Sequence, residues 1–172
     1  MNSGPSFKKN KHCDGPQDRE CGDWWTYLAI KSDSGFILAH FGGKRTEATC
    51  MHFLDLVFES LPLPMPDAPI VVATDGNPQY REGLAKLYCE PCITYGQVIK
   101  QRKENRLVAV IREAIWGEPT DEVISTSVVE GYNNKIRQRI SRFGRKTASF
   151  TKKIAAYVGA LNMFQFMNNF ID

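Results

Sequence analysis

Two carboxylates stand at positions where acidic residues commonly do chemistry, and the first is Asp75. It follows the short apolar run from Pro69 to Thr74 and precedes the turn residues Gly76 to Pro78. In α/β proteins, functional side chains gather at the carboxyl ends of such buried strands. A carboxylate there can hold a divalent cation, because hard cations prefer oxygen ligands. The alternative is that Asp75 only closes an Asx-turn or caps the helix that begins near Asn77.

The second carboxylate, Glu130, lies one turn into a helix that the apolar spacing predicts from Ser127. Asn134 and Arg137 follow on the same side of that helix, opposite its apolar stripe. Ser127 and Glu130 also have the spacing of a capping box, so Glu130 could simply accept a hydrogen bond from the Ser127 amide. If Glu130 pairs with Asp75, metal-ion chemistry gives it a role beyond capping the helix. Two Mg²⁺ ions held by shared carboxylates can activate a water or a 3′-hydroxyl for phosphoryl displacement, although this chemistry calls for a third carboxylate that the sequence does not clearly supply.

Positive charge is concentrated near the end of the chain. The net charge is only +3, yet residues 131–171 contain eight Lys or Arg and no Asp or Glu. Such a segment is typical of a polyanion-binding surface, and nucleic acid is the first candidate. A solvated basic helix face remains the alternative.

The rest of the chain predicts one α/β domain. Its 172 residues, 42% hydrophobic, are enough for one core. We expect residues 1–22 to be a partly disordered remnant of a first strand and loop, and residues 23–172 to be the domain, with a polar, irregular insertion at about 100–120. Apolar periodicity predicts the elements. They are a β-hairpin at 23–41, a helix at 46–61, a strand covered on both faces at 69–74, a helix at 79–88, a strand at 92–98, a helix from 127 to 144 and an apolar helix at 150–170. This order suggests a layered fold with a mixed sheet, closed by two basic helices.

Cysteine usage and hydropathy bear on the compartment. The five cysteines are an odd number without regular spacing, which argues against a secreted disulfide framework. Cys89 and Cys92 are separated by two residues, the spacing of a zinc knuckle or a redox pair, but no second cysteine pair accompanies them. No apolar stretch approaches the roughly 18 residues of a membrane span, and the N-terminus lacks the apolar core of a signal peptide. We therefore expect a cytoplasmic protein without a membrane partner.

Several stretches together resemble the DDE transposases of the insertion-sequence-one type and their archaeal relatives. The resemblance runs from about Ser6 to Phe170, and each stretch alone would be weak. The stretches that carry it are Gly22 to Ile30, Gly43 to Thr46, Thr74 to Gly76 with Tyr80, Tyr95 to Lys100, Ile124 to Glu130, and Arg137 to Lys153.

The resemblance implies an RNase H-like fold, in which a mixed central β-sheet is flanked by helices. It implies that Asp75 is the second catalytic aspartate and Glu130 the catalytic glutamate, with Mg²⁺ or Mn²⁺ as cofactor. It also implies contact with transposon-end DNA, mostly through phosphates, which provide affinity rather than sequence reading. We expect a homo-oligomer or association with an intact transposase. The expected DNA-contacting residues are Asn134, Arg137, Arg139, Arg142, Arg145 and Lys146.

The sequence also departs from the family pattern. The first catalytic aspartate of the family would fall at Asn2 and a nearby tryptophan at Pro5, while Asp23 matches a position that is not catalytic. The family's upstream DNA-recognition region is absent, and relatives continue briefly beyond Asp172. We therefore expect a transposase fragment impaired in cleavage and strand transfer, because neutral Asn removes a charge that holds the cations. The alternatives are a non-catalytic DNA-binding regulator and a general RNase H-like nuclease.

Overall fold

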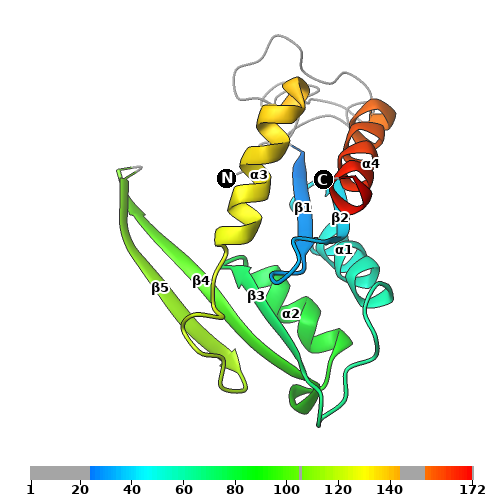
Figure 1. Ribbon diagram of the computed structural model, residues 1–172. Helices are drawn as coiled ribbons and strands as arrows, with labels where there is room; N and C mark the ends of the chain where they lie inside the picture. The colour runs from blue at the N-terminus through cyan, green and yellow to red at the C-terminus, as the bar shows by residue number, and fades with distance from the viewer. Residues whose placement is uncertain (1–23, 105, 144–153, 172) are drawn as a thin grey trace. The chain divides into compact units, whose positions relative to one another are not determined.

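The computed structural model describes residues 24–104, 106–143 and 154–171, and the chain forms two compact units. The first unit comprises the described residues up to Val57 and from Val129 onward, and the second comprises residues 58–128. Figure 1 labels the helices and strands. In chain order they are β1 (Trp25–Ile30), β2 (Ile37–Gly43), α1 (Glu47–Glu59), β3 (Ile70–Asp75), α2 (Pro78–Leu87), the short 3₁₀ turn η3 (Glu90–Cys92), β4 (Ile93–Lys103), β5 (Arg106–Trp116), α3 (Ser127–Arg139), the 3₁₀ turn η4 (Ser141–Phe143) and α4 (Ile154–Phe170).

The first unit is built on the antiparallel hairpin of β1 and β2, which confirms the expected hairpin. Its turn is closed by two backbone hydrogen bonds. The Gly35 N–H donates to the Lys31 carbonyl, and the Lys31 N–H donates to the Phe36 carbonyl. Gly35 has a φ of 71°, a conformation that glycine adopts without steric cost. The glycine at this position therefore meets a requirement of the turn backbone.

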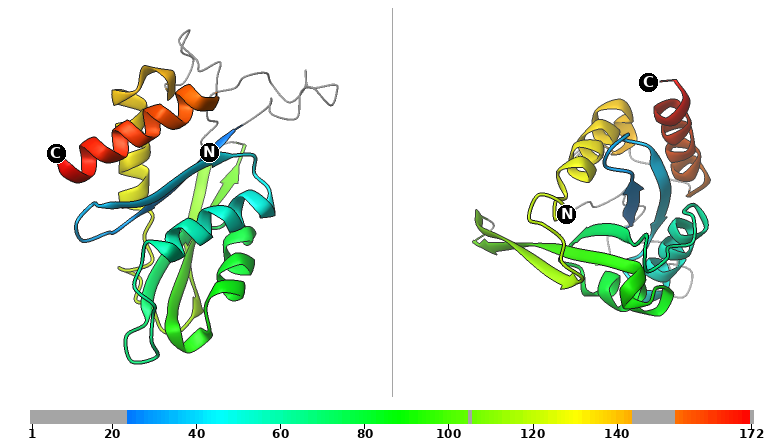
Figure 2. Two further views of the ribbon diagram at one scale, coloured as in Figure 1. Left: turned by 90° about the vertical axis from the view of Figure 1, so that its right-hand side faces the viewer. Right: turned by 60° about the horizontal axis from the view of Figure 1, so that its bottom comes forward.

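Helices cover both faces of this hairpin (Figure 2). Because side chains alternate along a strand, Leu28 and Ile37 face α3 and α4, where they join a core that contains Ile136, Tyr157 and Leu161. The opposite face packs against α1. There the Tyr27 ring lies 5.4 Å from that of Phe53, and the Phe41 ring lies 4.6 Å from that of His52. The predicted helix at 46–61 is thus confirmed as α1.

Amide side chains of α4 join this helix to the edge of β2. Asn169 accepts a hydrogen bond from the Ile37 N–H and donates one to the Ile37 carbonyl, both at 2.9 Å. Gln165 donates to the same carbonyl at 3.0 Å, and Asn168 donates to the Gly35 carbonyl at 3.1 Å. An open strand edge would otherwise leave these backbone groups to water or to another chain.

Helix α4 confirms the predicted apolar helix from Ile154 onward; residues 150–153 lie outside the described part of the chain. The expectation that two basic helices close the fold is wrong for α4, which contains no charged residue. Its outward side instead exposes Met163, Phe166 and Phe170. The lysines that suggested a basic helix, Lys152 and Lys153, precede its first described residue.

The second unit contains a mixed three-stranded sheet in the order β3-β4-β5. Strand β3 is parallel to β4, and β4 is antiparallel to β5. Helix α2 is the crossover between the two parallel strands, as such pairs require. The predicted strand at 69–74 and helix at 79–88 are confirmed. The expectation that the strand is covered on both faces is wrong, since Val71 on one face of β3 is 57% exposed.

Strand β4 is longer than the predicted strand at 92–98, and the expectation of an irregular stretch at 100–120 is wrong. Residues up to Lys103 continue β4, and β5 returns from Arg106 to Trp116 as its antiparallel partner. Because β3 ends where Asp75 pairs with Val98, the two longer strands continue beyond it as a two-stranded ribbon (Figure 1).

The chain is therefore an α/β protein with a mixed sheet and flanking helices, which is the coarser part of the predicted fold class. No helix in the described ranges is both long and apolar enough to cross a membrane.

Candidate functional site

Asp75 is the last residue of β3, at the carboxyl end of a strand that is parallel to its neighbour. Its side chain is exposed to solvent. One carboxylate oxygen, Oδ1, accepts a hydrogen bond from the Asn77 backbone N–H at 3.1 Å. This is the Asx-turn that the sequence offered as an alternative role for Asp75. The turn is followed at once by Pro78, which begins α2 with a fixed φ suited to the first helical position.

A buried glutamine holds this turn in place. Gln97 is only 6% exposed, and its Nε2 donates to the backbone carbonyls of both Asp75 and Asn77 at 3.3 Å. The Thr74 hydroxyl donates to the Asp75 carbonyl at 2.9 Å. Buried polar groups normally have such partners, because an unsatisfied one costs about 1–3 kcal/mol. The backbone at Asp75 is thus fixed from two strands.

Gln97 was not among the site residues predicted from the sequence. The signal lay in the sequence Tyr95-Gly96-Gln97-Val98, where a polar residue stands in the buried part of the strand. Gly96 is required there by close packing, since a Cβ at this position would lie 2.8 Å from Cδ1 of the buried Ile124.

Glu130 is exposed in the first turn of α3. An acidic residue near a helix N-terminus interacts favourably with the helix dipole. The Ser127 amide, which a capping box would direct at Glu130, donates to Ser125 Oγ at 3.3 Å. Ser125 Oγ also lies 2.9 Å from Ser127 Oγ, so the amide and the hydroxyl of Ser127 both contact the same serine side chain.

Helix α3 carries four of the expected DNA-contacting and catalytic residues on one element. Asn134 and Arg139 are exposed, Arg137 is half-buried, and Asn134 accepts a 3.0 Å hydrogen bond from Arg137 Nη1. Lys135, which was not among the expected contacts, lies over the Tyr132 ring, 4.9 Å from its centroid. Of the remaining expected residues, Arg142 belongs to η4, and Arg145 and Lys146 fall outside the described residues.

The two candidate carboxylates belong to different compact units, Asp75 to the second and Glu130 to the first. Each is therefore defined within its own unit, and their pairing stays a prediction. Within the ranges that the structure describes, no three His, Cys, Asp or Glu side chains gather in a group that could hold a metal ion. Asn2, Pro5 and Asp23 lie outside the described residues.

The Cys89 and Cys92 pair lies at η3, where the Cys92 N–H donates to the Cys89 carbonyl at 2.9 Å. Cys89 is exposed and Cys92 is buried. The hydrogen bond with the Cys89 side chain raises the pKa of the Cys92 thiol, and burial raises it further.

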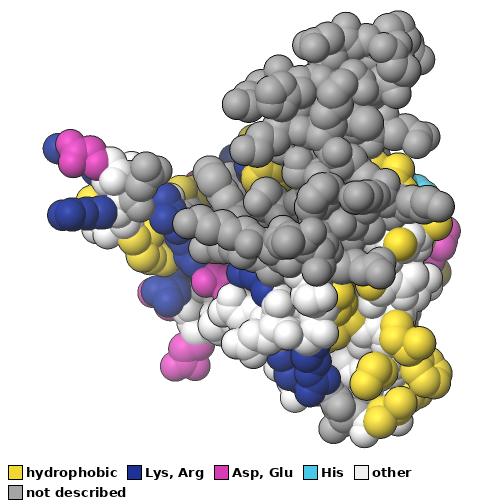
Figure 3. Space-filling view, turned by 90° about the horizontal axis from the view of Figure 1, so that it is seen from above, with side chains coloured by type: hydrophobic (Ala, Val, Ile, Leu, Met, Phe, Trp, Pro, Cys, Tyr) yellow, Lys and Arg dark blue, Asp and Glu magenta, His cyan; other side chains and the backbone are white. Residues whose placement is uncertain are grey.

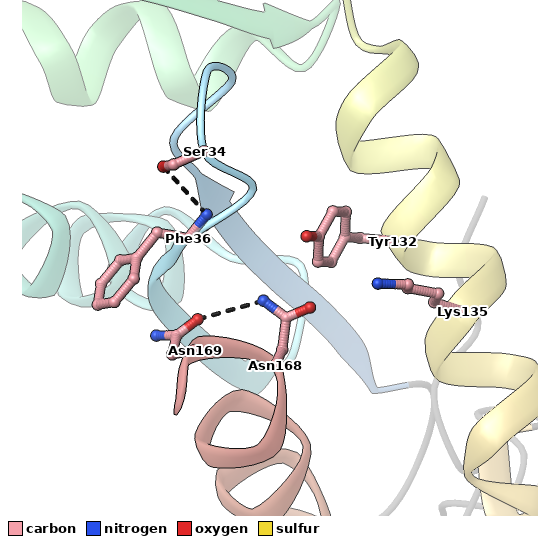
Figure 4. Close-up of a pocket in the computed structure, with 6 residues that line it drawn as sticks. All are labelled: Ser34, Phe36, Tyr132, Lys135, Asn168 and Asn169. Carbon is pink, nitrogen blue, oxygen red and sulfur yellow. Dashed lines mark hydrogen bonds between the residues drawn. The ribbon is translucent and has the colours of Figure 1, made fainter. Parts of the chain in front are cut away.

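A pocket of about 350 Å³ lies in the first unit, between the hairpin turn and the helices α3 and α4 (Figure 4). Most of its polar groups already have partners in the fold. Tyr132 Oη and Asn168 Nδ2 both donate to the Gly35 carbonyl, and Ser34 Oγ accepts from the Phe36 N–H. These groups hold the turn against the two helices. The pocket is lined by Ser34, Phe36, Tyr132, Lys135, Asn168 and Asn169.

Comparisons of the chain with protein-family models, with curated proteins and with solved structures find no match.

Proposed function

We propose that this chain is the catalytic part of a DDE transposase with an RNase H-like fold, which binds transposon-end DNA. The proposal is carried by Asp75. The residue that the motif resemblance assigns to the second catalytic aspartate ends a parallel strand and has a solvent-exposed carboxylate. Functional side chains of α/β proteins are commonly placed in this way.

The Asx-turn is compatible with a metal-binding role for Asp75. It uses one carboxylate oxygen and orients the side chain, which a metal ligand also requires. Asp75 and Glu130 are exposed oxygen ligands of the kind that Mg²⁺ or Mn²⁺ prefers. A cation held there would supply activation of a water or 3′-hydroxyl during phosphoryl displacement. Asp75 and Glu130 contribute the negative charge that holds it.

We further propose that cleavage and strand transfer are impaired, because Asn2 occupies the position of the first catalytic aspartate. Nicking of plasmids that carry the genomic DNA flanking the gene tests this, with Mg²⁺ or Mn²⁺ present. The unmodified chain should nick at background level, and Asn2→Asp should raise the rate. Adding Asp75→Asn to that variant should abolish the gain. Rapid cleavage by the unmodified chain would contradict impairment.

Two substitutions at Asp75 separate its turn from its charge. Asn forms the same Asx-turn as Asp, so Asp75→Asn should leave the free energy of unfolding nearly unchanged while it weakens Mn²⁺ binding. Asp75→Ala should lose both the turn and the charge. The lost hydrogen bond should lower the free energy of unfolding by about 1 kcal/mol. Calorimetric titration with Mn²⁺ and urea unfolding measure the two properties. Equal Mn²⁺ affinity in all three proteins would remove Asp75 from the metal site.

A second candidate function is a non-catalytic DNA-binding regulator of an intact transposase. The absence of a carboxylate at Asn2 favours it, together with the cations Arg137 and Arg139 on α3. It predicts DNA binding that weakens steeply with salt and is insensitive to Asp75→Asn. No binding at low salt would contradict both functions.

The proposal includes self-association, and α4 offers a surface for it. Met163, Phe166, Met167 and Phe170 follow each other at helical spacing and are 40–71% exposed. With about 200 Å² of surface for a side chain of this size, the four leave roughly 450 Å² open. That is a large part of the about 800 Å² that each partner of a stable complex buries. Two copies of a helix without charged residues can also meet without like-charge repulsion.

Light scattering after size exclusion measures the oligomeric state. Phe166→Ser should shift a dimer toward the monomer, because it places a hydroxyl in the centre of the stripe. Leu63→Ser is the matched control, since Leu63 is 74% exposed but lies in the second unit, outside α4. A monomer at all concentrations for the unmodified chain would refute self-association through α4.

A further inference from the structure

The two-stranded end of the β4–β5 hairpin is largely exposed to solvent. The ladder from Ile99 to Lys103 pairs only with β5, because β3 pairs no further than Val98. Apart from half-buried Ile99 and Ala109, the described residues from 99 to 113 are exposed. We call residues 99–113 the ribbon. It extends roughly 16 Å beyond the sheet, at about 3.3 Å per residue for the five residues from Ile99 to Lys103.

The ribbon is basic. It holds five cations against two acids, Glu104 and Glu113. Lys103 and Arg106 lie directly opposite each other in the ladder, a like-charge pair that weakens a hairpin unless an anion neutralises it. In Figure 3 basic side chains lie at the end of the projecting arm on either side of an acidic one, and apolar side chains lie next to them. The five cations are Lys100, Arg102, Lys103, Arg106 and Arg112.

Apolar side chains on the ribbon are also exposed to an unusual degree. Leu107, Val108, Val110 and Ile111 are between 42% and 60% exposed. Successive side chains of a strand point to opposite faces, so both faces of the ribbon carry apolar groups as well as cations. A surface that mixes cations with apolar groups is suited to DNA. The phosphates bind the cationic side chains, and thymine methyl groups contact the apolar ones.

We propose that the ribbon contacts duplex DNA, with Lys103 and Arg106 bound to phosphates. This inference rests on the proposed DNA-binding function and adds to it a contact surface in the second unit. The dimensions agree: strands in a pair lie about 4.8 Å apart, and the major groove, about 12 Å wide, admits a two-stranded ribbon. Bound phosphates also remove the repulsion between the paired cations.

The test is the salt dependence of binding to a 30-base-pair duplex, measured by fluorescence anisotropy. Each lost phosphate contact reduces the slope of log K against log salt by about 1. Lys103→Gln with Arg106→Gln should therefore reduce the slope by about 2. The matched control, Arg81→Gln with Lys86→Gln, removes two exposed cations from α2 in the same unit. Urea unfolding verifies that each variant is folded.

The outcomes are distinct. A reduced slope in the ribbon variant and an unchanged slope in the control support the inference. An equal loss in both variants overturns it, because net charge alone would explain the effect. A ribbon variant that binds like the unmodified chain also overturns it, while the proposed function stands if Arg137→Gln weakens binding. If the unmodified chain binds no DNA at low salt, the inference and the proposed function both fail.

Discussion

Tyr157 of α4 makes the stability of the first unit dependent on pH in the alkaline range. The side chain is completely buried, its hydroxyl lies 2.7 Å from Thr26 Oγ1, and its ring stacks on that of Phe143 at 4.9 Å. Burial raises the pKa of Tyr157 to about 12, although the hydrogen bond to Thr26 lowers it somewhat. The ordinary value for tyrosine is about 10.

A raised folded-state pKa gives stability that is complete below the unfolded pKa and is lost as the pH rises through the folded one. Below pH 10 the phenol is neutral in both states. Between about pH 10 and 12 the unfolded chain releases its proton first, which favours unfolding. At about 1.4 kcal/mol per pKa unit, a shift of two units removes about 2–3 kcal/mol.

Tyr157→Phe isolates this contribution. At pH 9 the variant should be less stable by about 0.5–1.5 kcal/mol, since Thr26 loses a hydrogen bond. At pH 12 it should be the more stable protein by about 1–2 kcal/mol, because only the unmodified chain must bury an ionising phenol at that pH. Urea unfolding followed by circular dichroism at pH 9, 10, 11 and 12 gives both curves. Other titrating groups are common to the two proteins and cancel in the difference.

The sign of the difference is the decisive result. If the free energies of unfolding of the two proteins stay a constant distance apart from pH 9 to 12, the phenol is not buried as the structure has it. A difference that widens in favour of the unmodified chain would refute the reasoning as well.

Three further substitutions test the packing of the first unit by urea unfolding. Gly42→Ala should destabilise by about 1–3 kcal/mol, because the added methyl would lie 2.8 Å from Cζ and Oη of the buried Tyr157; a neutral effect would contradict this packing. Gly131→Ala should stabilise by about 0.5–1 kcal/mol, since nothing lies within 4 Å of a Cβ on this helical residue; a loss would contradict that open space. Asn169→Ala should cost about 1–3 kcal/mol, because both backbone groups of Ile37 lose a partner; an unchanged midpoint would show that Gln165 and water suffice.

The sequence predicted the elements of the first unit well because each has a local cause. In the hairpin, side chains alternate between the two faces on either side of a turn that needs Gly35. Helix α1 has apolar residues at helical spacing and is followed by several prolines. Local periodicity did not reveal the amide bonds from α4 to β2. They join residues more than 120 positions apart, and no spacing rule links Asn169 to Ile37.

The ribbon was missed because the alternation rule presumes one buried face. Where both faces are exposed, polar residues follow one another on β4 from Lys100 to Lys103, and apolar residues do so on β5 from Leu107 to Ile111. Neither run has a period of two, so the stretch appeared irregular. Val71 is the opposite case. A continuous apolar run predicted a strand covered on both faces, whereas the face of β3 that carries Val71 is exposed to solvent.

At Asp75 the sequence offered two roles as alternatives, and the geometry removes the need to choose. The hydrogen bond from the Asn77 N–H uses one oxygen of an exposed carboxylate, and Gln97 fixes the backbone on which that carboxylate stands. A turn that orients a side chain without enclosing it is what a preorganised ligand needs, because the cost of ordering is met on folding rather than on binding. A purely structural Asx-turn would need no negative charge, since Asn closes the same turn. The negative charge at Asp75 also lies beside the N-terminus of α2, where the helix dipole favours it. The second carboxylate oxygen remains exposed, and it is the group that a cation would use.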